Sequence, residues 1–437
     1  MQPTPPPTRK DLALAEHVPP GARELAIGGI AAEELAGRFG TPLYVFAAEI
    51  LRRTLARVRA ALGPRVRVLY ALKANPNAAL ARVLRLAGAG AEIASAGEIH
   101  VARAAGFAGA DMHFAGPGKN HEDFALATAT GLGTLNLESE AEYTALAAFA
   151  RAKGARPGVA VRVNPKDAMA GSRMKMGGGS KKFGVDEPEL LPLLRRIRRE
   201  DVCTLRGLHV YAGTQSFDAA AWAANAGHLV DLANGLERDL GAPLASLNFG
   251  GGFGVASFEG DPDFDLERAG AGLQDRIARD ARPDRTYWVE LGRYLTAPAG
   301  VYLTRVVYAK TSQGKRHLIL DGGMHQHGAA AGLGSVIRRA FPMVPAREPW
   351  RTGAERYTCG GPLCTPADEF AADLLLPELH AGDLLAILVS GAYGLTFSNT
   401  MFLSHPAPAE VLVDGGQAWV VRERGRPEDA LRGQRLP

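Results

Sequence analysis

Cysteine is scarce in this sequence, and neither sign of charge is in large excess. The 437 residues include 3 cysteines and no Cys-x-x-Cys pair. So few thiols exclude a disulfide framework, and the missing pair argues against a structural zinc site. Lysine and arginine number 50 against 46 aspartates and glutamates, a balance that gives no reason to expect nucleic acid as a partner. We therefore expect a protein of the reducing cytoplasm.

Long apolar runs are also missing. No stretch reaches the roughly 18 uninterrupted apolar residues of a membrane-spanning helix. The first residues, MQPTPPPTRKDLALAEH, are rich in proline and lack the apolar core of a secretory signal. The run LLRRIRRE (193–200) reads as the solvated face of a helix rather than a basic docking site. The sequence therefore predicts no membrane partner.

What the chain does contain, from residue 66 onward, is a regular alternation of short β-prone runs with helix-prone runs rich in alanine and leucine. The β-prone runs are 66–74, 91–96, 111–116, 134–139, 159–165, 205–213, 244–252 and 286–292. Such alternation predicts βαβ units and a parallel sheet. Eight strands over this length match an α/β fold of the (β/α)8 TIM-barrel type, which usually takes about 250 residues, and a doubly wound sheet is the alternative.

The rhythm changes after residue 297. Five further β-prone runs follow without helices of similar length between them, at 301–310, 316–322, 383–390, 409–416 and 418–425. This pattern predicts a separate C-terminal antiparallel β domain. We expect an N-terminal arm at 1–40 that joins the β domain, a barrel at 41–296 and the β domain at 297–437. The strand-like segment TPLYVF (41–46) could itself pair with the later domain.

Barrel enzymes carry their chemistry at the carboxyl ends of the strands, so the residues after each strand are the candidates. Lys73 follows the first strand, and it is either an exposed charge or a reactive amine that can form a Schiff base. The glycines Gly250, Gly251 and Gly252 follow the seventh strand, and they form either a tight turn or a phosphate cradle. Barrels often bind phosphate after strands seven and eight, which favours the cradle.

The sixth and eighth strands supply the remaining candidates. After strand six, Tyr211 is either a core aromatic or a ring stacked on a flat cofactor, and Gly213 and Thr214 add an amide and a hydroxyl. Glu290, at the end of strand eight, could hold a protonated pyridine nitrogen, or it could form an ion pair with Arg293 at the rim. An amine, a phosphate cradle, an acid and a flat aromatic on one rim are what pyridoxal 5'-phosphate requires.

Short motifs along residues 38–415 resemble the fold-type III pyridoxal-phosphate decarboxylases, the family of diaminopimelate and ornithine/arginine decarboxylases. The matching segments, in order, are YALKAN (70–75), SAGE (95–98), NLES (136–139), RVNP (162–165), KKFG (181–184), GLHVYAGTQ (207–215), GGGFG (250–254), ELGRY (290–294), GPLCTPAD (361–368) and GAYG (391–394). The resemblance implies an alanine racemase-like barrel with a C-terminal β-barrel domain.

The same resemblance implies roles for individual residues. Lys73 would bind the cofactor covalently, and Glu290, Gly292, Arg293 and Tyr393 would hold it together with the residues named above. The enzyme would be a homodimer with shared active sites. Cys364 would come from the partner chain and reprotonate the α-carbon, a task suited to a thiol whose ordinary pKa is about 8.5.

Substrate contacts follow from the resemblance as well. Arg162, Thr365, His325 and Arg338 are the candidates for these contacts. Arg339 is an alternative to Arg338 for a second carboxylate of the substrate. His325 and His327 are spaced like metal ligands, but no carboxylate or cysteine partner is evident, so no metal is expected.

Three departures from the family pattern bear on the substrate. Thr365 stands where relatives carry an acid that binds the distal amine of the substrate, which disfavours diaminopimelate or ornithine unless Asp368 or Glu369 substitutes. Tyr211 replaces the usual stacking histidine. The run 171–185 is longer than usual, and it is either a flexible surface loop or a docking surface for a large anionic substrate.

These features resemble a subgroup that decarboxylates amino acids on larger groups, including acyl-carrier-bound glutamyl units, and relatives associated with exosortase genes. Decarboxylation of an amino acid within a larger or carrier-bound molecule is therefore the leading hypothesis, and the expected partner is a small-molecule or acyl-carrier-bound amino-acid substrate. Meso-diaminopimelate decarboxylation for lysine synthesis is the alternative. An amino-acid racemase is disfavoured by Glu290, and a non-catalytic homologue is disfavoured by the retention of Lys73 and Cys364.

Overall fold

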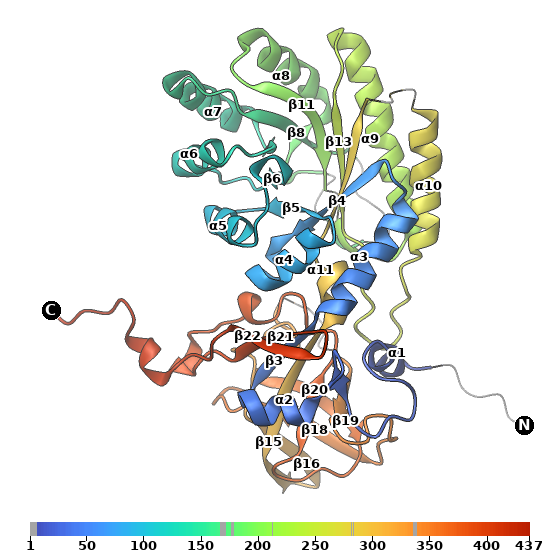
Figure 1. Ribbon diagram of the computed structural model, residues 1–437, viewed down its shortest axis with the longest axis vertical. Helices are drawn as coiled ribbons and strands as arrows, with labels where there is room; N and C mark the ends of the chain where they lie inside the picture. Colours follow the sequence, from blue (N-terminus) through green and yellow to red (C-terminus); the bar gives the residue numbers. More distant parts are fainter. Residues whose placement is uncertain are drawn as a thin grey trace, which may run out of the picture. The chain divides into compact units, whose positions relative to one another are not determined.

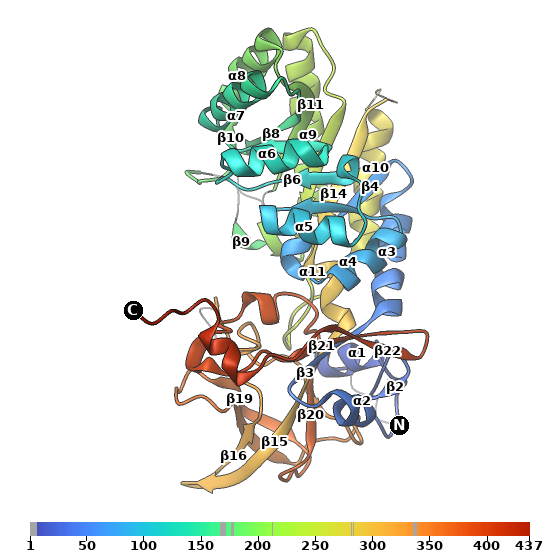
Figure 2. The ribbon, with the colours of Figure 1, turned by 60° about the vertical axis from the view of Figure 1, so that its left-hand side comes forward.

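Two compact units make up the chain. The computed structural model describes residues 7–166, 172–175, 179–211, 213–280, 282, 284–334 and 339–437. The barrel unit comprises residues 52–255 and 262–295, and the sheet unit comprises the remaining segments, 1–51, 256–261 and 296–437. Figures 1 and 2 label the elements of both. Among the residues that the structure describes, no helix combines the length and apolar character required to span a bilayer.

Eight parallel strands close into a ring in the barrel unit, which confirms the predicted (β/α)8 barrel. Around the ring the order is β8-β11-β13-β14-β4-β5-β6-β7, and β7 pairs again with β8. Their bounds are β4 (Val66–Ala71), β5 (Gly90–Ile93), β6 (Met112–Phe114), β7 (Thr134–Leu137), β8 (Gly158–Asn164), β11 (Thr204–Val210), β13 (Ser246–Gly251) and β14 (Thr286–Leu291). A short strand, β10 (Val185–Asp186), pairs in parallel with the end of β8.

Helices connect successive strands (Figure 1). They are α3 (Ala48–Leu62), α4 (Ala78–Leu86), α5 (Ala96–Ala104), α6 (His121–Thr130), α7 (Glu140–Lys153), α8 (Glu187–Glu200), α9 (Ala219–Leu240), α10 (Leu266–Arg279) and α11 (Arg293–Thr296). Two family-like motifs are helix starts, because Ser95 accepts a hydrogen bond from the Glu98 amide and Ser139 accepts one from the Glu142 amide. In α8, Leu193, Leu194 and Ile197 are buried, while Arg195, Arg198 and Arg199 are exposed, as the sequence predicted.

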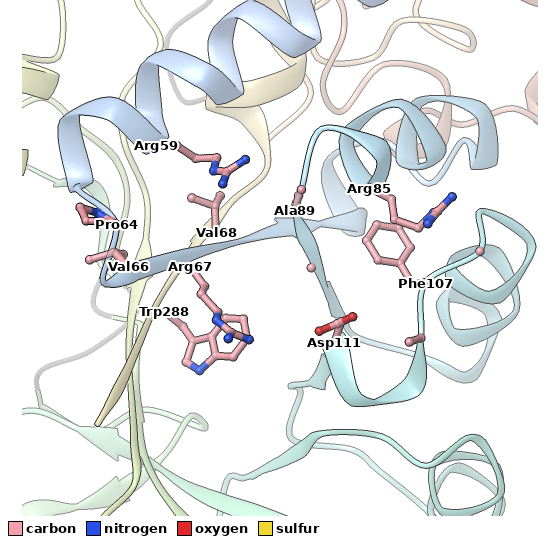
Figure 3. A pocket seen from close by; sticks show the side chains of 14 residues that line it. Arg59, Pro64, Val66, Arg67, Val68, Arg85, Ala89, Phe107, Asp111 and Trp288 are labelled. Atoms are coloured by element: carbon pink, nitrogen blue, oxygen red, sulfur yellow. The ribbon is translucent and has the colours of Figure 1, made fainter. Parts of the chain in front are cut away.

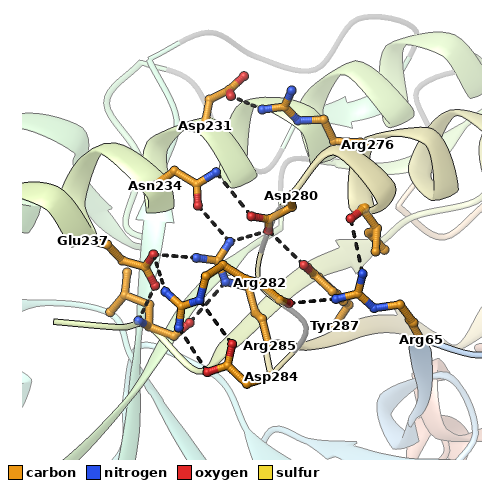
Figure 4. A network of polar contacts seen from close by, with 12 residues as sticks. Arg65, Asp231, Asn234, Glu237, Arg276, Asp280, Arg282, Asp284, Arg285 and Tyr287 are labelled. Atoms are coloured by element: carbon orange, nitrogen blue, oxygen red, sulfur yellow. Dashed lines mark hydrogen bonds and ion pairs between the residues drawn. The ribbon is translucent and has the colours of Figure 1, made fainter.

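A buried ionic network anchors the start of the last barrel strand (Figure 4). Arg285 contacts Asp280 at 2.5 Å and Glu237, at the end of α9, at 2.8 Å. The Tyr287 hydroxyl donates to Asp280 at 2.8 Å, and burial together with this carboxylate raises the pKa of Tyr287 to about 12. Arg282 contacts Glu237 as well, at 2.7 Å. The network joins the end of α9 to β14, the strand that carries Glu290.

The sheet unit is built around a nine-stranded sheet whose central path is β19-β18-β16-β15-β3-β21-β22. Its strands are β3 (Leu43–Ala47), β15 (Gly300–Ser312), β16 (Lys315–Leu320), β17 (Met343–Pro345), β18 (Glu355–Gly360), β19 (Glu369–Leu376), β20 (Leu384–Ile387), β21 (Ala409–Asp414) and β22 (Gln417–Arg422). Most pairings are antiparallel, but β16 with β18 and β3 with β21 are parallel. The segment 41–46 does pair with later strands, because β3 lies between β15 and β21.

The amino-terminal part of the sheet unit adds two helices and a small ribbon. The helices are α1 (Arg9–Ala15) and α2 (Ala32–Phe39), and the ribbon consists of β1 (Ala26–Ile27) and β2 (Ile30–Ala31). Thr8 caps α1 by accepting a hydrogen bond from the Asp11 amide, while the Asp11 carboxylate accepts one from the Thr8 amide. These elements precede β3 in the sequence.

Candidate active site

Lys73 lies where the first barrel strand ends. After β4, residues Leu72–Ala74 form a 3-10 turn that carries the lysine. Its Nζ lies 2.8 Å from Oε2 of Glu92, which is buried on the neighbouring strand β5. Burial raises the pKa of Glu92, while the charge of Lys73 opposes that shift. The amine therefore stands at the carboxyl end of the barrel, paired with a buried carboxylate, while its own side chain is 36% exposed.

Glu290 is the buried acid of the site. It is 2% exposed on β14, where it accepts a hydrogen bond from Asn248 Nδ2 at 2.7 Å. His209 Nε2 lies 3.3 Å from its other oxygen. Burial alone would favour the neutral acid, but the charge and hydrogen bond of His209, with Lys73 and Asn248, lower the pKa of Glu290 to about 2. The carboxylate is thus ionised at neutral pH.

The glycine run after β13 is required by close backbone approaches. Gly250 and Gly252 have φ of +64° and +85°, a region that L-residues with side chains rarely adopt. A Cβ on Gly250 would lie 2.3 Å from the Val210 carbonyl, and one on Gly252 would lie 2.0 Å from the Gly213 carbonyl. A Cβ on Gly251 would meet the backbone of Glu290. The three glycines therefore let this loop run directly against the ends of β11 and β14.

One amide of this loop already has a partner. The Gly250 N–H donates to Asn248 Oδ1 at 3.0 Å, while the Asn248 amide group donates to Glu290. Gly250 thus contributes conformation rather than a free donor. In the same way, a Cβ on Gly292 would lie 2.7 Å from Ala74 Cβ, so Gly292 allows the end of β14 to pass close to the Lys73 turn.

Tyr211 borders the same site from the end of β11. Lys73 Nζ lies 5.3 Å from the centroid of its ring, and the Arg162 guanidinium carbon lies 5.9 Å from it. Gly213 and Thr214 follow in β12 (Gly213–Ser216). This strand pairs antiparallel with β9 (Ser172–Lys175), so part of the long run 171–185 is a strand attached to the region after β11. Residues 171 and 176–178 of that run lie outside the described residues.

Arg162 already pairs with a carboxylate of the protein. It is buried on β8, and its Nη1 donates to both oxygens of Glu138, at 2.9 and 3.2 Å. Glu138 also accepts hydrogen bonds from the amides of Gly116 and Gly184. The Phe183 ring lies 4.8 Å from the Arg162 guanidinium carbon. Arg162 therefore holds the NLES and KKFG segments together, and its role toward a substrate stays a prediction.

Cys364 and Thr365 occupy a loop of the sheet unit before β19. The Cys364 thiol is exposed, and the Thr365 hydroxyl accepts a hydrogen bond from the Ala367 amide at 3.2 Å. Asp368, in the same loop, is buried and accepts hydrogen bonds from the amides of Met324 and Leu363 at 2.6 and 2.8 Å. Because these contacts occupy both of its oxygens, Asp368 ties two loops together. The substitution of Asp368 or Glu369 for the acid missing at Thr365 stays a prediction.

The histidine segment lies in one of the loops that Asp368 ties. His325 is 1% exposed, and burial lowers its pKa to about 4. His327 Nε2 lies 2.9 Å from the Ser390 hydroxyl. Within the described part of the chain, no three His, Cys, Asp or Glu side chains gather as a metal site.

The remaining predicted residues are Tyr393, Arg293 and the pair Arg338 and Arg339. Tyr393 is half-buried, has φ of +54° and packs edge-on against Phe397. Arg338 lies outside the described residues, whereas Arg339 contacts Asp261 at 3.2 Å. Arg293 is half-buried at the start of α11, directly after β14.

The predicted site residues thus fall into two sets, one in the barrel unit and one in the sheet unit. Lys73, Tyr211, Glu290, Arg162 and the glycines all belong to the barrel unit, and the distances above connect them. Cys364, Thr365, His325 and Tyr393 belong to the sheet unit, and their place beside Lys73 stays a prediction.

Sequence reasoning missed three side chains of the barrel site: Glu92, His209 and Asn248. Each lies on a strand whose other residues are mostly apolar and buried. A charged or amide side chain in such a strand is the signal that could have identified them, because buried polar groups require partners.

Comparisons with known proteins agree with this site. Residues 48–297 match the family model described as "Pyridoxal-dependent decarboxylase, pyridoxal binding domain". The chain is 37% identical over 406 residues to the L-glutamyl-[BtrI acyl-carrier protein] decarboxylase of Niallia circulans, covering 92% of this chain and 95% of that protein. It is 30% identical over 417 residues to a diaminopimelate decarboxylase of Zymomonas mobilis, covering 94% and 96%.

Among solved structures, the diaminopimelate decarboxylase of Helicobacter pylori complexed with L-lysine is similar over 92% of this chain and 98% of that chain. Its TM-score is 0.84 at 27% identity. The likeness extends across both the barrel unit and the sheet unit, since the two lengths covered are nearly complete.

Proposed function

Because the chain belongs to the pyridoxal-dependent decarboxylases, we propose that it removes the α-carboxylate of an amino acid that is part of a larger or carrier-bound molecule. The observation that carries the substrate class is Thr365. A neutral hydroxyl cannot give a buried ammonium group the charge-assisted hydrogen bond that an acid would give. The 37% identical relative, which acts on a carrier-bound glutamyl group, supports the same choice.

Pyridoxal phosphate fits the residues of the barrel unit. The glycine loop lies at the end of β13, packed against the ends of β11 and β14, which is the place where barrels often bind phosphate. Lys73 supplies the amine that an aldehyde requires, and Tyr211 supplies a flat face beside it. Glu290 supplies an ionised carboxylate for a pyridine nitrogen. When bound, the cofactor supplies an electron sink for the pair left by the departing carboxylate.

The residues of this chain then carry out separable tasks. Glu290 holds a proton on a ring nitrogen, and it stays ionised because His209 and Asn248 hydrogen-bond to it. Glu92 holds the Lys73 ammonium at the end of β4. The Cys364 thiol donates a proton to the α-carbon after carbon dioxide leaves.

The exposed position of Cys364 supports a shared site. We place the thiol in the active site of the other protomer of a homodimer, as Cys364 of the partner subunit. A mixture of two inactive proteins, Lys73→Ala and Cys364→Ala, tests this arrangement. Mixed dimers would regain part of the activity, because one of their two sites holds both intact residues.

Meso-diaminopimelate decarboxylation is the second candidate, favoured by the relatives of that name at 30–35% identity. The deciding experiment gives the purified enzyme, saturated with pyridoxal phosphate, either meso-diaminopimelate or a glutamyl group on an acyl-carrier protein. We expect carbon dioxide from the carrier-bound glutamyl group and little lysine from diaminopimelate. Robust lysine formation would reverse the choice, and Lys73→Ala is the inactive control.

A Thr365→Glu variant tests the substrate argument itself. If the missing acid excludes diaminopimelate, the variant should form lysine where the unmodified enzyme does not. A variant that gains no lysine formation while it retains carrier-bound activity would show that Thr365 is not the determinant.

A further inference from the structure

A cavity lies at the opposite end of the barrel from Lys73. It has a volume of about 440 Å³ and lies against the starts of β4, β5 and β14, whereas Lys73 follows the end of β4 (Figure 3). Its most prominent side chains are Arg59, Arg67, Arg85, Phe107, Asp111 and Trp288. The volume falls in the range of roughly 300–1,000 Å³ that is typical of small-molecule sites.

The lining of this cavity carries a net positive charge. Three guanidinium groups and one carboxylate line it. Arg59 Nη1 donates to the Ala87 carbonyl at 2.9 Å, and Arg85 Nε donates to the Ala105 carbonyl at 2.9 Å. Each guanidinium has five N–H donors, so both arginines are oriented by one contact and retain donors for a ligand.

Arg67 is the arginine of the cavity that has no evident structural role, in contrast to Arg59 and Arg85. Arg59 and Arg85 cap the ends of helices α4 and α5, because Ala87 and Ala105 are the residues after those helices. Arg67 lies on the strand β4 and caps no helix. Among the described residues, its one interaction is with the Trp288 ring, whose centroid lies 5.4 Å from the guanidinium carbon.

Trp288 gives the cavity a flat apolar wall. It is 8% exposed, and its ring packs against His113 inside the barrel with centroids 4.5 Å apart. Phe107 adds a second aromatic side chain to the lining (Figure 3). The lining thus combines aromatic surface with cationic donors, which suits a ligand that has a flat or apolar body and an anionic group.

We propose that this cavity binds a small organic anion, through a phosphate or carboxylate group held by Arg59, Arg67 and Arg85 and a flat body against Trp288. The site is separate from the decarboxylase site, because its lining contains none of the residues assigned to that site. It therefore does not depend on which amino acid the enzyme decarboxylates.

The test measures binding of phenyl phosphate to the holoenzyme by isothermal titration calorimetry. Saturation with pyridoxal phosphate keeps the phosphate subsite of the active site filled. Phenol, which lacks the anionic group, is the ligand control. Arg67→Gln is the test variant, and Arg57→Gln, an exposed arginine on the same helix as Arg59 but outside the lining, is the matched control.

We expect one phenyl phosphate to bind per chain. In Arg67→Gln the dissociation constant should rise at least about tenfold, since one charge-assisted hydrogen bond is lost. Arg57→Gln should bind as the unmodified enzyme does. Equal affinity in Arg67→Gln, or no binding up to about 10 mM phenyl phosphate, would overturn the proposal.

An Asp111→Asn variant tests the same proposal by an expected gain in affinity for phenyl phosphate, rather than a loss of affinity. Removing the one carboxylate of the lining should tighten phenyl phosphate binding about two- to fivefold. An unchanged or weakened affinity in this variant would contradict an anion site even if Arg67→Gln failed to fold.

Discussion

Lys73 and Glu92 form an ion pair across two adjacent barrel strands, with 2.8 Å between Nζ and Oε2. Glu92 is buried, and its second oxygen, Oε1, has no hydrogen-bond partner among the described residues. Burying a carboxylate with only one hydrogen-bonded oxygen costs free energy of folding, and the ion pair with the Lys73 amine offsets part of that cost. The pair therefore holds Lys73 at the end of β4, where a cofactor must meet it.

Replacing Glu92 with Gln should slow decarboxylation about tenfold or more, because the amide lacks the charge that orients the Lys73 ammonium. Steady-state kcat with saturating pyridoxal phosphate measures this effect. Glu92→Asp should recover part of the loss. Glu140→Gln, which changes an exposed acid on α7, is the control and should leave kcat unchanged.

Glu290→Gln should lower kcat by a factor of about 10²–10³, because a neutral amide cannot hold a proton on the ring nitrogen where negative charge develops. The pKa of Glu290 is lowered to about 2, so the unmodified enzyme should show no loss of rate from this group between pH 5 and 8. The kcat–pH profiles of both proteins provide the measurement. A Gln variant with an unchanged kcat would remove Glu290 from the mechanism.

Cys364→Ala should reduce product formation by orders of magnitude while cofactor binding is retained, because the thiol acts on the α-carbon and not on the cofactor site. The visible absorbance of bound pyridoxal phosphate and the rate of amine formation separate these two effects. Cys203→Ala, a change at a buried cysteine of the barrel unit, is the comparison. If Cys364→Ala retains both the rate and the product, the proton comes from another group.

Acidification should destabilise the protein in part through His327. Burial lowers the pKa of His327 to about 3, below its ordinary value of about 6.5 in an unfolded chain. The unfolded state therefore binds the proton first, so stability is complete above pH 6.5 and falls as the pH drops toward 3. The loss between pH 7 and pH 5 should be about 2 kcal/mol for this group.

Urea unfolding at the two pH values measures that loss. A His327→Gln variant should lose correspondingly less stability between pH 7 and pH 5, whatever its stability at pH 7. His380→Gln, at an exposed position, should retain the pH dependence of the unmodified protein. An identical pH dependence in His327→Gln would show that other groups account for the acid sensitivity.

Several strands of the sheet unit, and their pairing, could not be predicted from the sequence as the barrel could. The strands β18 and β19 were not predicted, because the alternation in β18 is confined to Tyr357 and Cys359 and β19 does not alternate. Strand β3 lies early in the chain, but it pairs with β15 and β21, which come more than 200 residues later. Pairing over such separations depends on how the whole unit packs rather than on local pattern.

The sequence by itself determined the barrel, the glycine loop and the positions of Lys73 and Glu290, because the carboxyl ends of parallel strands share one edge whatever their partners. The tertiary structure alone decided which polar side chains meet there. The strand order places β13 between β11 and β14, so Glu290 meets Asn248 on the adjacent strand and His209 one strand further on. Likewise, loop packing decided that Asp368 binds backbone amides, since a buried carboxylate takes whatever donors surround it.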